Sequence, residues 1–163
     1  MAEIVLTRKN GDVYTVLVDD EDLERVRAAG PWYVFSVSKS NHYPYVKAYV
    51  PNKRGSVIYL HRLITNAEPG QIVDHINRDG LDNRRANLRL CSRSQNNGNR
   101  HRNQNNTSGF KGVSWCQKRR AWTACISRDS RTLHLGSFET PEEAHSAYCS
   151  AALEYFGDFA RFK

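Results

Sequence analysis

The sequence predicts an α+β protein made of small antiparallel sheets, each accompanied by a helix. Residues 3–18 have the pattern of a β-hairpin, residues 72–96 follow the order strand, loop, strand and helix, and residues 109–163 combine three alternating strands with an amphipathic helix. The 163 residues are enough for one ordinary domain or two small ones. The length therefore permits a two-part organisation.

The N-terminal region, residues 1–55, is predicted to be rich in β-structure. Strands are expected at residues 4–7 and 13–18, on either side of Asn10-Gly11, a pair that favours tight turns. A short helix capped by Asp20 should follow and end at Gly30-Pro31.

Three further strands are expected at residues 32–37, 42–50 and 56–60, which are rich in aromatic and β-branched side chains. Turns at residues 38–41 and 51–55 separate them. We expect this β-rich region to belong to the same domain as the residues that follow it.

The charge of the chain favours a polyanionic partner. The net charge is +7 and the isoelectric point is near 9.4, which is typical of nucleic-acid-binding proteins and, less often, of proteins that bind acidic membrane surfaces. Residues 83–131 hold twelve Lys or Arg and one acid, Asp129, whereas residues 19–22 are all acidic. Two interpretations of the basic block remain, a nucleic-acid surface and a merely solvated face.

The four cysteines, Cys91, Cys116, Cys125 and Cys149, form no CxxC pair and have no ligand-like spacing with the histidines. We therefore expect reduced thiols and no structural zinc. No apolar run approaches the ~20 residues that cross a bilayer, and no apolar targeting segment follows Met1. These features predict a cytoplasmic protein that does not bind membranes.

The chemically informative stretch contains Asp74 and His75 in a predicted strand, Asn87 before a second strand, and Asn96 in a predicted helix. Ser92 and the residue three positions later form an S-x-x-Q capping box, so the helix should begin at residue 93. Neighbouring residues of a strand point to opposite faces, so Asp74 and His75 converge only at a strand end or a bulge.

These residue types suit phosphodiester hydrolysis, which needs a metal at the phosphate and a base that activates water. Asp74 and Asn96 offer oxygen ligands for a hard cation such as Mg²⁺ or Mn²⁺. His75, with an ordinary imidazole pKa of ~6.5, can accept the proton of water at neutral pH.

The segments DHIN (74–77), NLRL (87–90) and SQNN (94–97) resemble the HNH nuclease motif of phage and intron-encoded homing endonucleases. The third motif residue is Asn96 in place of histidine. The resemblance implies a ββα-metal fold, His75 as general base, one divalent ion held by Asp74 and Asn96, and Asn87 as the residue that orients the hairpin carrying the histidine. The alternative, a turn with a solvated histidine, is disfavoured because three segments match in order.

His61, in the segment LHRL (60–63), has two interpretations. A similar segment accompanies the HNH motif in many related proteins, which implies a supporting role near the site. The residues themselves favour a packed or backbone-bonded histidine.

Residues 99–108 are predicted to be a basic polar linker, because the stretch around them has no large apolar residue with which to build a core. Arg100 and Arg102 are expected to follow a DNA backbone, although a pure spacer explains the composition equally well.

Residues 109–163 are predicted to form three strands covered by one helix. The apolar strand positions alternate, and Trp115 and Trp122 are expected to lie in the core. Thr140 and Glu143 form a capping box with a proline between them, and a stripe of Ala and Tyr residues follows.

The opposite face of this sheet is polar and rimmed by positive charge, so we expect it to lie in the major groove of double-stranded DNA. The expected DNA contacts are Lys111, Ser114, Lys118, Arg119, Arg120, Ser127, Arg128, Arg131 and His134.

The segments GVSW, WTACI, LGSF and TPEEAHSAY, within residues 112–148, resemble the plant APETALA/ethylene-response-factor DNA-binding domain. That domain has the same three-strand-plus-helix form and is fused to HNH nucleases in phages and bacteria. The plant domains read bases largely with Arg and Trp, where this chain has Ser114, Cys116, Cys125 and Ser127. The target sequence therefore does not carry over.

Together these features predict a homing-type HNH endonuclease of a mobile element, acting as a monomer, or as a dimer, in a bacterial or phage-infected cell. The alternatives are a non-catalytic DNA-binding regulator and, less favoured, an RNA-binding protein. The expected domains are a β-rich region at 1–55, an HNH core at 56–98, a linker at 99–108 and a DNA-binding domain at 109–163.

Overall fold

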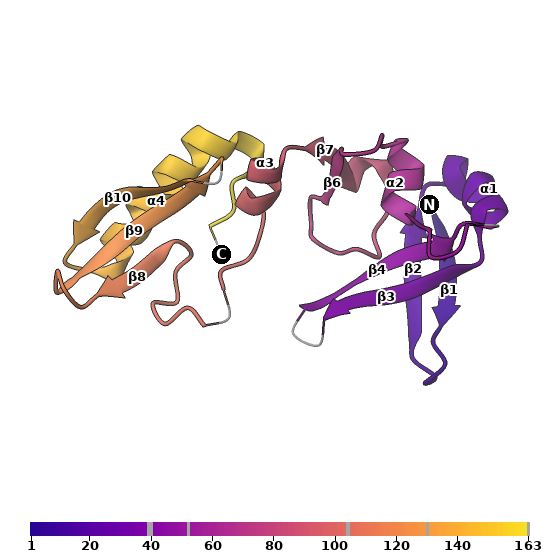
Figure 1. The fold of residues 1–163 in the computed structure, drawn as a ribbon, viewed down its shortest axis with the longest axis horizontal. Coiled ribbons are helices and arrows are strands. Elements are labelled where there is room, and N and C mark those ends of the chain that lie inside the picture. Colours follow the sequence, from indigo (N-terminus) through magenta and orange to yellow (C-terminus); the bar gives the residue numbers. More distant parts are fainter. Residues whose placement is uncertain (39–40, 52, 104, 130, 163) are drawn as a thin grey trace. The chain divides into compact units, whose positions relative to one another are not determined.

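The computed structural model describes residues 1–38, 41–51, 53–103, 105–129 and 131–162. The chain divides into two compact units, Met1–Leu90 and Cys91–Lys163 (Figure 1). The α+β class is confirmed, since each unit combines small antiparallel sheets with few helices. Several positions of the predicted turns, linker and C-terminal domain lie outside the described residues: Lys39, Ser40, Asn52, Gln104, Ser130 and Lys163.

The first unit holds two two-stranded sheets and one three-stranded sheet, in the orders β1-β2, β6-β7 and β3-β4-β5. A 3₁₀ turn at Arg85–Asn87 precedes β7. Its strands and helices are β1 (Ala2–Thr7), β2 (Val13–Val18), α1 (Asp20–Ala29), β3 (Trp32–Ser38), β4 (Asn41–Tyr49), β5 (Val57–Tyr59), α2 (Leu60–Thr65), β6 (Ile72–His75) and β7 (Leu88–Cys91).

Strand alternation builds the core of this unit. Val16 and Val18 of β2, Val46 and Ala48 of β4, and Val26 of α1 are fully buried or nearly so. The β1-β2 hairpin pairs in antiparallel register, as the sequence predicted. Burial of these side chains stabilises the unit by ~25 cal/mol per Å² of apolar surface removed from water.

Two local expectations in this unit were wrong. Helix α1 has Asp19, not Asp20, at its N-cap position, and the Asp19 carboxylate accepts a hydrogen bond from the Arg85 backbone N–H (2.8 Å) instead of capping its own helix. The strand expected to reach residue 60 ends at Tyr59, and α2 begins at Leu60. Leu60 and Ile64, one helical turn apart, are both buried, but a helix this short leaves little periodic signal.

The second unit is a three-stranded antiparallel sheet, in the order β10-β9-β8, with α4 packed on one face (Figure 1). The predicted three strands and helix are thus present. Its elements are α3 (Arg93–Gly98), β8 (Val113–Cys116), β9 (Ala121–Arg128), β10 (Arg131–Phe138), α4 (Pro141–Phe156) and a 3₁₀ turn at Gly157–Phe159.

Both predicted capping boxes are present. Thr140 Oγ1 accepts a hydrogen bond from Glu143 N (3.2 Å), and Ser92 Oγ accepts one from Gln95 N (3.1 Å). Each box satisfies backbone donors that the first helical turn leaves open, so α3 and α4 start where the sequence predicted.

Trp115 does not lie in the core, contrary to expectation. Its side chain is 45% exposed, and its indole N–H donates to Gln117 Oε1 (2.9 Å). The Trp122 ring, 5.3 Å away and edge-on, packs against the small core of Val113, Ala124 and Ala144, so Trp115 covers only the margin of that cluster.

No helix in the described part of the chain is long and apolar enough to cross a bilayer.

Gly112 and Gly109 offer a matched test of packing in the second unit, since both have positive φ (+76° and +80°). A Cβ at Gly112 would lie 2.1 Å from Tyr148 Cδ2, whereas one at Gly109 would meet no atom within 4 Å. We expect Gly109→Ala to cost roughly 1–2 kcal/mol of unfolding free energy from backbone strain alone. Gly112→Ala should cost roughly 1–3 kcal/mol more because of overpacking, as measured by urea denaturation. Equal losses in the two variants would contradict this account of Tyr148.

Candidate active site

Asp74 and His75 are the last two residues of β6, and both are buried, with 7% and 4% of their surface exposed. The chain turns directly after them. Ile76 N donates to Asn87 O (2.9 Å), and Arg78 adopts a left-handed conformation with φ +66°. The pair thus stands at a strand end, where adjacent side chains can serve one site.

The His75 imidazole is held by Asn83. Nε2 lies 3.3 Å from Asn83 Oδ1, and the Asn83 amide nitrogen donates to Gly80 O (3.1 Å). Since this second bond turns the amide oxygen toward the ring, Nε2 is the donor, and the neutral ring carries its lone pair on Nδ1.

Burial lowers the pKa of His75 below its usual 6.5, although the hydrogen bond with Asn83 and the nearby carboxylates of Asp74, Asp79 and Asp82 act in the opposite direction. Removal of the ring from water disfavours its charged form. Burial therefore favours the neutral imidazole, which is the form that a general base requires.

His75 belongs to a cluster of rings. The His61 ring lies 5.1 Å from that of His75, the Tyr45 ring lies 5.8 Å from both, and Tyr59 stacks on His61 at 5.5 Å. Burial, followed by the neighbouring His75 and Arg62, lowers the pKa of His61 to about 3. Within the described residues, the buried Nδ1 of His61 has no hydrogen-bond partner. His61 is a packed, uncharged residue beside the candidate base.

Asp74 forms an ion pair that the sequence did not predict. Nε and Nη2 of Arg89 both lie 3.0 Å from Asp74 Oδ2, and the Arg89 side chain is only 17% exposed. Arg89 projects from β7, the strand beside β6, so the contact depends on the pairing of the two strands. The only signal in the sequence was an arginine between the two leucines of the NLRL segment.

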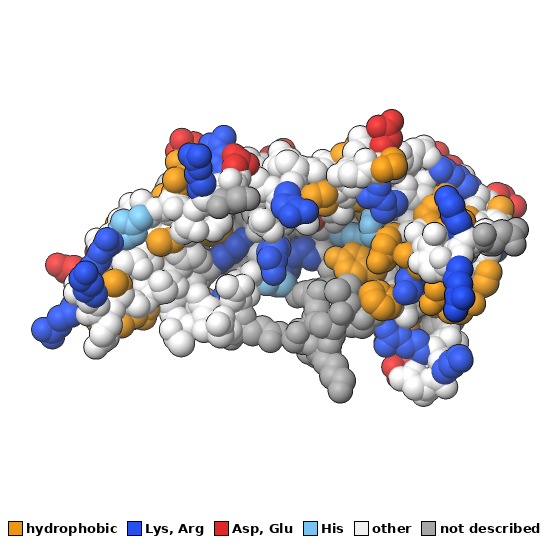
Figure 2. Space-filling view, viewed as in Figure 1, with side chains coloured by type: hydrophobic (Ala, Val, Ile, Leu, Met, Phe, Trp, Pro, Cys, Tyr) orange, Lys and Arg blue, Asp and Glu red, His pale blue; other side chains and the backbone are white. Residues whose placement is uncertain are grey.

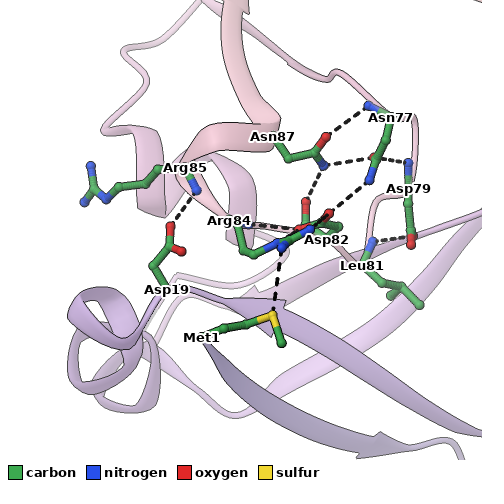
Figure 3. Close-up of polar contacts among 9 residues, drawn as sticks. All are labelled: Met1, Asp19, Asn77, Asp79, Leu81, Asp82, Arg84, Arg85 and Asn87. Atoms are coloured by element: carbon green, nitrogen blue, oxygen red, sulfur yellow. Dashed lines mark hydrogen bonds and ion pairs between the residues drawn. The ribbon is translucent and has the colours of Figure 1, made fainter.

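A hydrogen-bond network closes the loop between β6 and β7 (Figure 3). The buried Asn87 side chain donates to Asn77 Oδ1 (2.9 Å) and Asp82 O (2.7 Å), and its oxygen accepts from Asn77 N (3.0 Å). Arg84 and Asn77 donate to the Asp82 carboxylate, and the Arg84 hydrogen bond lowers the pKa of Asp82. Asn87 is thus placed to hold the loop that carries Asn83.

Arg85 pairs with three acids of the acidic run near the N-terminus. Its backbone N–H contacts Asp19, and its guanidinium lies 2.7 Å from Asp22 and 3.0 Å from Glu21 (Figure 3 shows the Asp19 contact). Of the described residues, only these three acids form a group whose ligand atoms lie close enough together for one metal ion. Their contacts make the group an ion-pair cluster.

Asn96 lies on α3, in the second unit, and is half-buried. Its backbone N–H donates to Ser92 O (3.0 Å), within the turn that the capping box fixes.

The predicted DNA-binding positions on the sheet of the second unit are exposed, with one exception. Arg119, from the β8-β9 turn, lies across β10, with Nη1 2.6 Å from His134 Nε2 and 3.3 Å from Ser137 Oγ. This contact puts a guanidinium on the polar face, whereas the sequence placed Arg119 only in the turn. The exposed predicted positions are Ser114, Lys118, Arg119, Arg120, Ser127, Arg128, Arg131 and His134.

Lys111 is the exception. It is 8% exposed, and its ammonium donates to Gly98 O (2.6 Å) and lies 5.9 Å from the Tyr148 ring centroid. An internal helix-capping contact therefore takes the place of the DNA contact that we expected, since a lysine is buried only when its charge is paired or hydrogen-bonded.

Arg100 and Arg102 are exposed and line one groove together with Ser114 and Ser127 of the sheet. The basic segment of the predicted linker therefore borders the polar face of the same unit.

Comparison with known proteins identifies both parts of the chain. The HNH endonuclease profile matches residues 58–98, and the AP2 domain profile matches residues 108–158. Protein 3.8 of Escherichia phage T7 is 32% identical over 94 residues, which cover 58% of this chain and 77% of the phage protein. The chain belongs to the same family as this phage protein and contains an HNH endonuclease domain. The HNH match contains Asp74, His75, Asn87 and Asn96, and the AP2 match contains the second unit's sheet and α4, so both resemblances noted in the sequence are confirmed. No solved structure matches this HNH protein.

The buried histidines predict a pH-dependent stability. His61 binds a proton near its ordinary pKa of 6.5 when unfolded but only near pH 3 when folded, so the unfolded chain holds more protons between these values. The free energy of unfolding should therefore fall as the pH drops below about 6.5, by at most ~1.4 kcal/mol per pH unit for one such group.

Urea denaturation at neutral and mildly acidic pH tests this dependence. His61→Leu should have a shallower pH slope than the native protein, whereas Tyr59→Phe, which keeps the stacked ring and the imidazole, should keep the native slope. An unchanged slope in His61→Leu would show that His61 is not the titrating group.

Proposed function

We propose that this protein is a divalent-metal-dependent DNA endonuclease of the homing type, with His75 as general base. The observation that carries the proposal is the buried His75 ring at the end of β6, whose Nε2 lies 3.3 Å from Asn83 Oδ1 and whose pKa is lowered by burial. Its Nδ1 lone pair is the proton acceptor that activates the attacking water.

The other residues of the motif have supporting roles. Asp74 and Asn96 would provide the oxygen ligands for one hard cation such as Mg²⁺ or Mn²⁺, since such ions prefer carboxylate and amide oxygens. When bound, the cation would stabilise negative charge on the phosphate and the leaving oxygen. Asn87 positions the loop that holds Asn83, and Arg89 orients the Asp74 carboxylate by its two contacts with Oδ2.

The AP2 domain is proposed to dock on double-stranded DNA through its polar face, with Arg100 and Arg102 along the backbone. The proposed division of the chain is 1–55, 56–98, 99–108 and 109–163. One candidate active site per chain favours nicking by a monomer, inside a bacterial or phage-infected cell.

A non-catalytic DNA-binding regulator is the second candidate. The observation that favours it is the Arg89 guanidinium on Asp74, because a carboxylate oxygen already paired with an arginine is a poorer ligand for a cation. Arg89 must share or release Asp74 Oδ2 for the endonuclease proposal to hold.

A nicking assay on supercoiled plasmid decides between the two candidates. With Mg²⁺ or Mn²⁺ the native protein should produce nicked circles, a chelator should stop the reaction, and His75→Ala should lower the rate by roughly 10²–10⁴-fold because the base is lost. DNA affinity should stay nearly unchanged in His75→Ala. His145→Gln, an imidazole change on α4, is the matched control and should cut normally. Retained DNA binding without nicking in any metal would favour the regulator.

The docking role predicts a particular salt dependence. Arg119→Ala combined with Arg120→Ala should weaken binding to duplex DNA and reduce the slope of log K against log salt by ~0.9 for each phosphate that the variant no longer neutralises. Lys111→Met is the control, since its ammonium bonds Gly98 O inside the unit and should not contribute to the slope. Anisotropy titrations at several salt concentrations measure both; a slope unchanged by the double arginine change would contradict docking through this face.

A further inference from the structure

The outer face of the β3-β4-β5 sheet carries aromatic rings that the core does not use. Trp32 and Ala48 point inward and are buried, whereas the opposed pair Tyr33 and Lys47 points outward. Tyr33 and Tyr49 are 48% and 57% exposed and meet edge to face, with ring centroids 5.8 Å apart. We call this surface the aromatic face; its residues are Tyr33, Phe35, Tyr45, Lys47, Tyr49 and Tyr59.

The aromatic face is continuous with the candidate active site. The Tyr45 ring lies 5.8 Å from that of His75, and Tyr59, opposite Lys47 on the neighbouring strand, stacks on His61. A molecule lying on the exposed rings therefore lies along the surface that leads to the candidate general base.

The charge around the face fits an anion. Residues 25–67 contain seven Lys or Arg and no Asp or Glu. Lys47 Nζ lies 3.9 Å from the Phe35 ring centroid and 5.5 Å from that of Tyr49, so the lysine ammonium group lies among the rings. Figure 2 shows hydrophobic side chains gathered over β3 and β4, with Lys and Arg side chains among them.

We propose that the aromatic face binds unpaired nucleotides of the DNA next to the site of cleavage. Bases stack on Tyr33 and Tyr49, and Lys47 contacts a phosphate. Duplex DNA offers a protein its phosphates and base edges, whereas a tyrosine ring stacks only on a base that has left its neighbours. An acidic protein surface would also complement the positive charge of this face, but it has no bases that could stack on the exposed rings.

This inference rests on the proposed endonuclease function and narrows its substrate. The preferred DNA contains an opened or single-stranded segment beside the bond that is cut. Duplex affinity would then come from elsewhere on the protein, and the aromatic face would supply the preference for opened DNA.

Anisotropy titrations of the full-length chain carrying His75→Ala, in chelator, test the proposal without cleavage. The probes are one labelled duplex and the same duplex with a central stretch of mismatched, unpaired nucleotides. The protein should prefer the opened duplex, and Tyr33→Leu with Tyr49→Leu should weaken binding to it by about tenfold or more, with little change for the closed duplex.

Two control variants separate stacking from other effects. Tyr33→Phe with Tyr49→Phe keeps both rings and should keep the preference. Val5→Ser with Val13→Ser removes apolar surface of similar exposure, 62% and 63%, from the β1-β2 hairpin of the same unit and should also keep it. Unfolding curves of all variants check that the fold is retained.

Two results would overturn the inference: equal affinity for open and closed DNA, or a Phe variant as weak as the Leu variant. If the protein nicks plasmid but binds opened DNA equally well without the tyrosine rings, this inference fails and the endonuclease proposal stands. If binding to opened DNA requires the tyrosine rings but the protein never nicks plasmid, the nucleotide-binding site is supported and the endonuclease proposal fails.

Discussion

The loop between β6 and β7 depends on the side chain of Asn87. Its three hydrogen bonds to Asn77 and Asp82 bring the two ends of the loop together, and the same loop carries Asn83, whose amide sets the tautomer of His75. An asparagine suits this position because one side chain both donates and accepts, so it can satisfy buried backbone groups on either side. Each bond contributes only ~1 kcal/mol net, but a buried partner left unsatisfied costs about 1–3 kcal/mol, and this asymmetry keeps the loop in one conformation.

Burial then sets the chemistry of the histidine. The aromatic rings of Tyr45 and His61 around His75 exclude water, which lowers its pKa, and three carboxylates near it limit that effect. With 4% of its surface exposed, His75 is poorly placed to exchange protons with bulk water. In the proposed reaction, the proton that His75 accepts must come from a water molecule brought into the site with the substrate.

The features that the sequence predicted are the local ones. The capping boxes of α3 and α4 use residues three positions apart, and the strand-end placement of Asp74 and His75 follows from the polar loop directly after them. The fold class follows from periodicity, which is also a local property.

The features that it missed depend on residues distant in the chain. Arg89 reaches Asp74 because β6 and β7 are neighbours, and Lys111 is buried because Gly98 presents a carbonyl to it. Composition identified Lys111 only as a basic residue, since an exposed lysine and a buried one look the same in sequence. The exposure of Trp115 is also a matter of packing, because the Trp122 ring packs against the small core while the Trp115 ring meets it only edge-on at 5.3 Å.

The two surfaces proposed to bind DNA differ in chemistry, so they would contribute differently to recognition. The exposed face of the AP2 sheet is polar and rimmed with arginine, so DNA binding by this face would draw its free energy largely from displaced counterions and would weaken as salt rises. The aromatic face presents rings with one lysine among them, so its contribution comes largely from stacking, which salt affects much less. Stacking becomes available only after base pairs have opened, at a cost of a few kcal/mol. If the aromatic face holds opened DNA beside His75, cleavage would be confined to places where the duplex opens readily, and docking by the AP2 sheet would supply the residence time for that opening.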